Sequence, residues 1–237
     1  MAETTRMALP LLEAGQTQKH VTVNEALTRL DALAAGVVAS RALSDPPPGP
    51  VEGLAYLVAG EGGGAWAGRG GQIAFFDNGG WSFARPWDGQ RVWVADEGQA
   101  VVFVVGAWRA GIGVSESGAA TVARVVSIDH VVGAGGASAT PAFIPDKAVV
   151  IGVTARVTET LTGDGLTGWR LGVADDPARY GAGYGVAAGS FAHGVTGAPL
   201  AYYGGTEMVL SPEGGAFTGG RVRLAAHLLT LEPPAPA

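Results

Sequence analysis

The residues best suited to recognising a ligand gather between positions 175 and 193. Two carboxylates, an arginine and two tyrosines follow one another in a segment whose glycines and proline indicate a loop. Sugar sites combine aromatic faces, which stack on C–H groups, with planar polar side chains, which bind hydroxyls. The candidate carbohydrate contacts are therefore Asp175, Asp176, Arg179, Tyr180, Tyr184 and His193. Trp169, Tyr202 and Tyr203 lie nearby in sequence and are better explained as core residues of a β-sandwich.

These residues give little support for a catalytic function. A glycoside hydrolase needs two carboxyl groups a few ångströms apart, and Asp164 and the Asp175-Asp176 pair lie in predicted loops near Glu159. Surface turns explain such carboxylates better, because any acidic chain contains them. The sequence has no G-x-S-x-G motif and no serine at a recognised spacing from His and Asp. We expect no enzyme activity.

Metal, cofactor, nucleic-acid and membrane binding are not expected either. Cysteine is absent, and the four histidines are scattered without metal-ligand spacing. The glycine-rich segments 60–64 and 68–71 lack the Lys-Ser/Thr pair and the helix of a phosphate site. With 15 Lys and Arg residues and a net charge of -6, no basic surface for phosphates is expected. Residues 1–13 do not resemble a signal peptide, and no apolar run is long enough for a membrane span, so we expect synthesis in the cytoplasm.

The elements that must position the candidate residues begin with an N-terminal arm and helix in residues 1–45. Thr22 and Glu25 have the spacing of a capping box, and apolar residues recur behind them at helical intervals. The pattern predicts a helix over about residues 23–39, packed either on its own domain or on copies of itself. The prolines of residues 46–50 predict a stiff, extended connector after it.

Two β-regions are predicted to follow. The first covers residues 46–110, with hairpin turns at 77–80 and 96–98 and a core built from most of its tryptophans. Residues 111–120 are predicted to be a flexible joint. The second region, residues 121–232, has short strands separated by turns and predicts a β-sandwich of jelly-roll type before an extended tail at 233–237. Its strand candidates are residues 122–126, 148–157, 169–173, 185–188, 200–203, 208–210 and 221–231. The predicted fold class is therefore mainly β with one short N-terminal helix.

Residues 9–27 carry the most specific motif, L-P-L-L-E-A-G-Q-T-Q-K-H-V-T-V-N-E-A-L. It resembles the opening of a family of alphaproteobacterial prophage and gene-transfer-agent proteins with the form L-P-x-L-x-A-G-Q-x-Q-K-H-V-T-x-N-E-A-L. The likeness covers about residues 7–110 and includes V-A-D-E-G at 94–98. The second half, from residue 144 onward, resembles the β-domain often attached to that module. One departure is G-A-W at 106–108, where relatives more often carry an Asp-Gly turn.

The resemblance implies a tail-fibre or head-spike protein without catalytic residues. On this interpretation the chain is a virion structural component at the particle surface, made in a bacterial cytoplasm and released by lysis. Its expected partners are copies of itself, as a trimer or pentamer with the trimer preferred, the capsid vertex or tail, a companion spike protein, and the host's capsular polysaccharide. Two alternatives remain open: an architectural adaptor that joins capsid vertex or tail to a separate receptor-binding fibre, and a capsule depolymerase.

Overall fold

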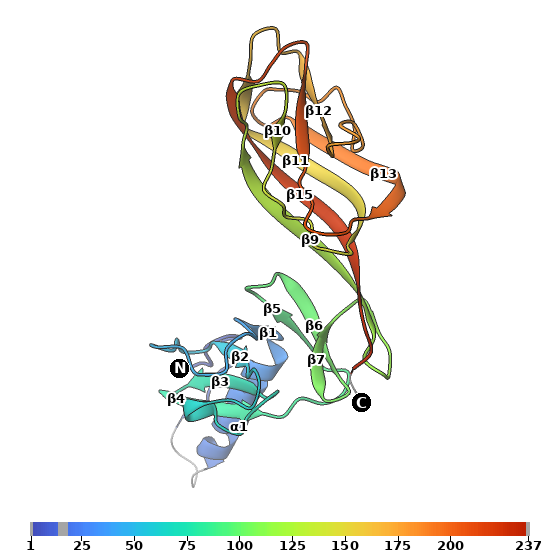
Figure 1. Ribbon diagram of the computed structural model, residues 1–237. Helices are drawn as coiled ribbons and strands as arrows, with labels where there is room; N and C mark the ends of the chain where they lie inside the picture. Colours follow the sequence, from blue (N-terminus) through green and yellow to red (C-terminus); the bar gives the residue numbers. More distant parts are fainter. Residues whose placement is uncertain (1, 14–18, 236–237) are drawn as a thin grey trace. The chain divides into compact units, whose positions relative to one another are not determined.

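The computed structural model describes residues 2–13 and 19–235 (Figure 1). Motif residues 14–18 and tail residues 236–237 lie outside this part of the chain. The chain divides into two compact units, Met1–Ala120 with Pro233–Ala237, and Thr121–Glu232. The predicted mainly β class with one N-terminal helix is confirmed. No helix among the described residues is long and apolar enough to cross a membrane.

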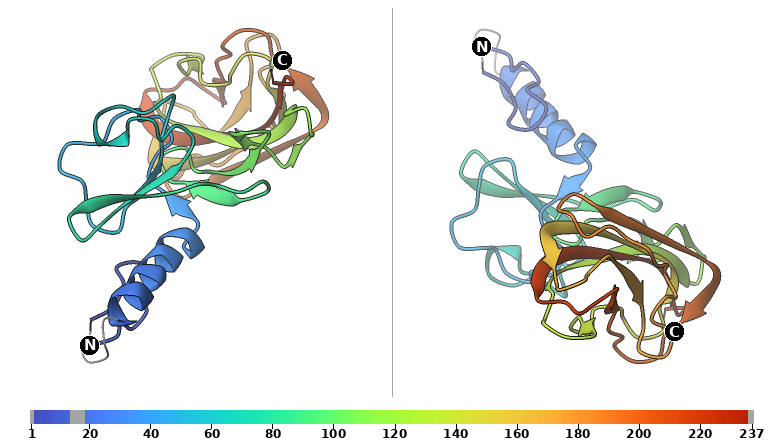
Figure 2. Two further views of the ribbon diagram at one scale, coloured as in Figure 1. Left: turned by 90° about the horizontal axis from the view of Figure 1, so that it is seen from below. Right: turned by 90° about the horizontal axis from the view of Figure 1, so that it is seen from above.

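The N-terminal helix α1 (Lys19–Ala34) begins and ends earlier than predicted. Thr22 lies inside α1, so the predicted capping box does not start the helix. The helix ends before Gly36, whose φ of 61° is the left-handed conformation that glycine adopts after a helix. Residues beyond it form strand β1 (Val37–Val38) instead of the predicted last helical turn. Both views of Figure 2 show α1 extending away from the strands of its own unit.

The described part of the first unit contains two small sheets. One has the order β1-β5-β6-β7, in which β1 is followed by β5 (Arg91–Val94), β6 (Gln99–Val104) and β7 (Ala107–Ala110). The other has the order β2-β3-β4, made of β2 (Ala55–Leu57), β3 (Ile73–Asp77) and β4 (Gly80–Ala84). The predicted hairpin between β3 and β4 is confirmed, because Asp77 pairs with Gly80 around Asn78 and Gly79, both at positive φ. The second predicted hairpin joins β5 and β6.

The core of the β2-β3-β4 sheet is aromatic. Trp66, in the 3-10 helix η1 (Gly64–Trp66), is fully buried. Its ring centroid lies 5.6 Å from that of Tyr56 and 5.0 Å from that of Trp81. Trp66 and Trp81 belong to this core, as expected for most of the tryptophans, whereas Trp87 and Trp93 are 57% and 46% exposed.

The residues that lead into the proline-rich connector and the joint do not stand apart from the first unit. The Ala59 N–H donates to the Leu43 carbonyl, and the Gly63 N–H donates to the Ser44 carbonyl, both at 2.9 Å. Strand β8 (Gly113–Val114) lies inside the segment predicted to be a flexible joint, and the Ser115 N–H donates to a carbonyl four residues later at 2.8 Å. The structure thus joins residues 1–45 and 111–120 to the small β-domain in one unit.

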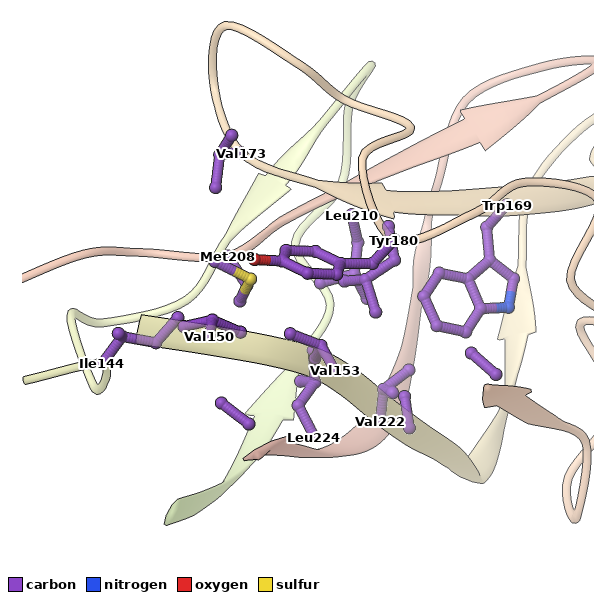
Figure 3. Close-up of a cluster of buried hydrophobic side chains, with 14 of the residues drawn as sticks. Ile144, Val150, Val153, Trp169, Val173, Tyr180, Met208, Leu210, Val222 and Leu224 are labelled. Atoms are coloured by element: carbon purple, nitrogen blue, oxygen red, sulfur yellow. The ribbon is translucent and has the colours of Figure 1, made fainter. Parts of the chain in front are cut away.

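The second unit is a β-sandwich, as predicted. Within the described residues, this unit contributes β13, β11, β15 and β9 to the five-stranded sheet β13-β11-β15-β9-β8, and its other sheet has the order β10-β14-β12. Their strands are β9 (Ala120–Val131), β10 (Ser138–Ala139), β11 (Val149–Thr162), β12 (Gly168–Gly172), β13 (Phe191–Ala201), β14 (Val209–Glu213) and β15 (Gly219–Glu232). Figure 3 shows Val153 and Leu224 of the first sheet facing Trp169 and Leu210 of the second. The predicted core roles of Trp169 and Tyr202 are correct, whereas Tyr203 is 81% exposed.

Strand β13 is the main departure from the predicted strands. Residues 185–188 form no strand, and the predicted strand at 200–203 covers only the end of β13. The sequence of β13 contains two glycines and a proline, which obscure its alternation. Gly194 is needed for packing, because a Cβ there would lie 2.2 Å from the carbonyl oxygen of Tyr180.

Candidate functional sites

The outward face of the five-stranded sheet carries an open, shallow hollow of about 290 Å³. The strand register places its outward-facing side chains in two rows across β13, β11 and β15. One row holds Phe191, Arg156 and Arg223, and the next holds His193, Thr154 and Ala225. Alternate residues of the same strands, such as Val153 and Leu224, face the core. We call these six residues and the space above them the hollow.

An aromatic ring and a cation lie side by side in the first row of the hollow. Phe191 is 65% exposed, and the guanidinium carbon of Arg156 lies 5.8 Å from the centroid of its ring. Arg156 Nη1 also donates to the Gly189 carbonyl at 2.9 Å. A guanidinium group has five N–H donors, so others are available to a ligand.

The remaining polar groups of the hollow are held by neighbours. Arg223 donates through Nε and Nη2 to Oδ1 and Oδ2 of Asp129 on β9, at 2.6 and 2.8 Å. The hydrogen bonds from Arg223 lower the pKa of Asp129, and the same contact raises the pKa of Arg223. The Thr154 hydroxyl lies 3.0 Å from Nε2 of His227. The Arg223 charge is therefore neutralised, and the Thr154 hydroxyl has a fixed position.

The hollow suits a sugar better than a metal ion or a small apolar ligand. It offers an exposed ring face for C–H stacking together with a guanidinium, a hydroxyl and an imidazole for sugar hydroxyls. It is shallow and open, so one unit of a longer polymer can lie across it. No group of three or more His, Asp or Glu side chains in the described part of the chain could hold a metal ion.

Of the six predicted carbohydrate contacts, only His193 lies in the hollow. Asp175 and Asp176 are exposed in the turn that follows β12. Arg179 lies 3.9 Å from the Asp176 carboxylate and donates to the Ala198 carbonyl at 2.9 Å. The predicted loop therefore does not form one binding surface with His193.

The prediction that Tyr180 contacts a ligand is wrong. Tyr180 is only 1% exposed and lies among the core side chains of the sandwich (Figure 3). Its hydroxyl lies 2.8 Å from the hydroxyl of Tyr202. Burial raises the pKa of Tyr180. Tyr184 is half-buried: its hydroxyl donates to the Tyr180 carbonyl, and its ring centroid lies 5.2 Å from that of Trp169. The loop turns its aromatic side chains inward because Gly194 leaves room for the Tyr180 backbone.

In the first unit, α1 presents an apolar stripe to solvent. The stripe consists of Val23, Ala26, Leu30 and Leu33, which are three and four residues apart in turn, as in a coiled coil. Val23 is 40% and Leu30 is 54% exposed. We call these four residues the helix stripe. On the opposite side of α1, Asn24 exchanges two hydrogen bonds, of 2.9 and 3.0 Å, with the backbone of Leu12.

Asp31 holds the N-terminal arm, residues 2–12, against α1. It is 4% exposed and accepts hydrogen bonds from the Thr4 hydroxyl at 2.8 Å and from the backbone N–H groups of Arg6 and Met7 at 2.9 and 2.6 Å. Arg6 in turn donates to the Ala32 carbonyl at 3.0 Å, near the end of the helix. The arm thus covers one side of α1, and Val23 and Leu30 of the helix stripe stay exposed among the described residues.

Comparison with known proteins gives a family match but no function. Residues 23–109 match the family described as "Protein of unknown function (DUF2793)". No curated protein matches the chain in sequence. A solved structure described as "Cyanophage Pam1 capsid asymmetric unit" is 21% identical, over 51% of this chain and 92% of that chain. Its TM-score of 0.35 is too low to support any argument about fold or function.

Sequence reasoning missed Arg156 and Asp31, although signals for both were present. Arg156 alternates with buried residues along β11, and this alternation predicts that its side chain lies on the solvent-exposed face of the strand. Asp31 follows Asn24 by seven residues and therefore lies on the same side of the helix. Asn24 and Asp31 thus mark one polar side of the helix, and this side contacts another segment of the chain.

Proposed function

We propose that this chain is a structural subunit of a spike or fibre on the surface of a phage-like particle, released from its producer by lysis. In this proposal the second unit attaches the particle to the host's capsular polysaccharide. The main support for attachment to polysaccharide is the hollow, because Phe191, Arg156 and His193 offer an open aromatic and polar surface on a sheet face. The resemblance of the N-terminal motif to prophage and gene-transfer-agent proteins supports the particle assignment.

Attachment through an open hollow depends on many copies of the chain. A shallow site gains little from each sugar hydroxyl, because protein hydrogen bonds replace hydrogen bonds to water. Several linked sites on a repeating polymer can raise avidity by roughly 10²–10⁴. The helix stripe supplies a surface for self-association, since it is uncharged and has coiled-coil spacing. We propose a homo-oligomer, with a trimer preferred over a pentamer, that is held on the particle by capsid-vertex or tail proteins.

The carboxylates near the hollow favour binding over hydrolysis. A glycoside hydrolase needs a carboxylic acid whose pKa is raised, so that it can protonate the leaving group. The pKa of Asp129 is lowered by its hydrogen bonds from Arg223. Glu159 accepts a hydrogen bond from Arg221 Nε at 3.1 Å. Asp129 therefore lacks the environment of a general acid, and Glu159 is held in an ion pair with Arg221.

The architectural adaptor is the second candidate. The observation in its favour is exposed apolar surface on the first unit: Val37 and Trp93 are neighbours across β1 and β5, and both are exposed. Trp87 is also exposed. Aromatic residues are enriched at protein interfaces, so this surface fits a protein partner better than a sugar polymer.

Deletion of residues 2–34 tests the particle assignment. It removes the arm and α1 but keeps β1, which pairs with β5. We expect the variant to fold and to be absent from purified particles, measured by mass spectrometry of gradient-purified material. Incorporation at the wild-type level would show that the arm and α1 do not attach the chain to the particle.

A further inference from the structure

The arginines of the five-stranded sheet differ in how their charges are compensated. Three of the four have an acidic partner: Arg124 lies 3.7 Å from Glu232, Arg221 lies 3.1 Å from Glu159, and Arg223 lies 2.6 Å from Asp129. Arg156 forms no ion pair with any residue that the structure describes. It is the arginine of this sheet whose charge is left for another molecule.

Arg156 is also held in a defined position. The Gly189 carbonyl accepts a hydrogen bond from Nη1, and the guanidinium carbon lies 5.8 Å from the centroid of the Phe191 ring. A fixed guanidinium is suited to a carboxylate, which it can bind through two parallel hydrogen bonds. Neutral sugars would leave this charge uncompensated in a chain whose net charge is -6.

We infer that the hollow binds an acidic sugar, a hexuronate unit of a polysaccharide, with its carboxylate on the guanidinium group of Arg156. This inference rests on the proposed attachment to polysaccharide and names the class of sugar. The ring of the same sugar lies on the exposed face of Phe191. Thr154 and His193, in the adjacent row, donate to or accept from its hydroxyls.

The test compares polymers that differ only in their carboxyl groups. Full-length protein is immobilised at high density and exposed to polygalacturonate, to the same polymer after reduction of its carboxyl groups, to dextran sulfate, and to purified host capsule. The test variant is Arg156→Gln. Arg170→Gln is the matched control, because Arg170 is an exposed arginine on β12 in the other sheet and its substitution changes the net charge equally.

We expect the wild-type protein and Arg170→Gln to bind polygalacturonate at least roughly tenfold more tightly than the reduced polymer, as a lost charged hydrogen-bond pair implies. Arg156→Gln should lose this preference while its thermal unfolding temperature stays at the wild-type value. Equal binding of the two polymers, or equal losses in both variants, would overturn the inference. Binding to dextran sulfate as strong as to polygalacturonate, and equally weakened in both variants, would show attraction of any polyanion and would also overturn it.

The measurement with purified host capsule separates this inference from the proposed function on which it rests. Capsule binding that does not depend on Arg156 would overturn the acidic-sugar assignment and leave polysaccharide attachment intact. If neither capsule nor any polymer is retained, both the inference and the proposed attachment are wrong.

Discussion

Arg223 and Asp129 form a two-point ion pair between the neighbouring strands β15 and β9, with N–O distances of 2.6 and 2.8 Å. Arg223 also lines the hollow. Because the pair neutralises Arg223, the positive charge of the hollow comes from Arg156, in the same row of side chains. The pair therefore limits how strongly the hollow attracts an anion.

Asp129→Asn should strengthen binding to an acidic polysaccharide. The substitution removes the partner of Arg223 and adds a second uncompensated cation to the hollow. We expect a several-fold higher affinity for polygalacturonate, with a steeper loss of binding as salt is added, since salt screens exposed charges. Binding measured by biolayer interferometry at several NaCl concentrations checks this.

Glu159→Gln is the control for that substitution. It releases Arg221, which does not line the hollow, and changes the net charge by the same amount. A general charge effect would strengthen binding equally in both variants. Weaker binding of Asp129→Asn than of the wild type would contradict the role given to the Arg223–Asp129 pair.

The second unit should lose stability as the pH falls from about 7 to 5. His130 is buried, its Nε2 lies 2.8 Å from the Ser138 hydroxyl, and burial lowers its pKa. The unfolded chain therefore takes up a proton near the ordinary histidine pKa of about 6.5, where the folded chain does not. The contribution of neutral His130 to the free energy of unfolding is fully present above that pH. It decreases as the pH falls toward the lowered pKa of the folded state.

Chemical denaturation of wild type and His130→Gln at pH 7.5 and pH 5 measures this effect. The free energy of unfolding should depend less on pH in His130→Gln than in the wild type. An identical pH dependence in the two proteins would show that His130 is not the group responsible.

The two predicted hairpins and the fold class follow from local signals. Asn78 and Gly79 tolerate positive φ, so the residues on either side of this turn can pair as β3 and β4. The predicted end of α1 lies too far along the chain, because apolar residues 37 and 38 continue the helical pattern past Gly36, whose positive φ terminates the helix. The hollow could not be predicted, since it depends on which residues of β11, β13 and β15 pair across a distance of many residues. Tyr180 lies in a segment with the composition of a surface loop, and only tertiary packing buries its side chain.

Asp31→Ala should release the N-terminal arm from α1. The substitution leaves the Arg6 and Met7 N–H groups without their acceptor, which costs on the order of 2–3 kcal/mol. Hydrogen exchange of residues 2–12 should accelerate accordingly, while exchange in the sandwich stays unchanged. Glu25→Gln is the control, because Glu25 is an exposed carboxylate of the same helix. It should leave the hydrogen exchange of residues 2–12 unchanged. Unchanged exchange in Asp31→Ala would mean that the arm is held by other contacts.

Leu30→Lys should weaken self-association without unfolding the chain. Leu30 is 54% exposed, so a lysine is tolerated in the separate chain, but it places a charge in the centre of the helix stripe. Analytical ultracentrifugation at micromolar concentration should show oligomers for the wild type and a shift toward monomer for the variant. Glu25→Lys adds the same side chain outside the stripe and should leave the oligomer intact. A monomeric wild type would contradict self-association through α1.

Adsorption to cells tests the central claim most directly. Beads densely coated with the full-length chain are mixed with encapsulated host cells and with a capsule-deficient mutant of the same strain. If the chain attaches the particle to polysaccharide, the beads should retain encapsulated cells, free capsule should compete, and Arg156→Gln beads should retain fewer cells than Arg170→Gln beads. Equal retention of encapsulated and capsule-deficient cells, or no retention of either, would contradict attachment to capsule and favour the architectural adaptor.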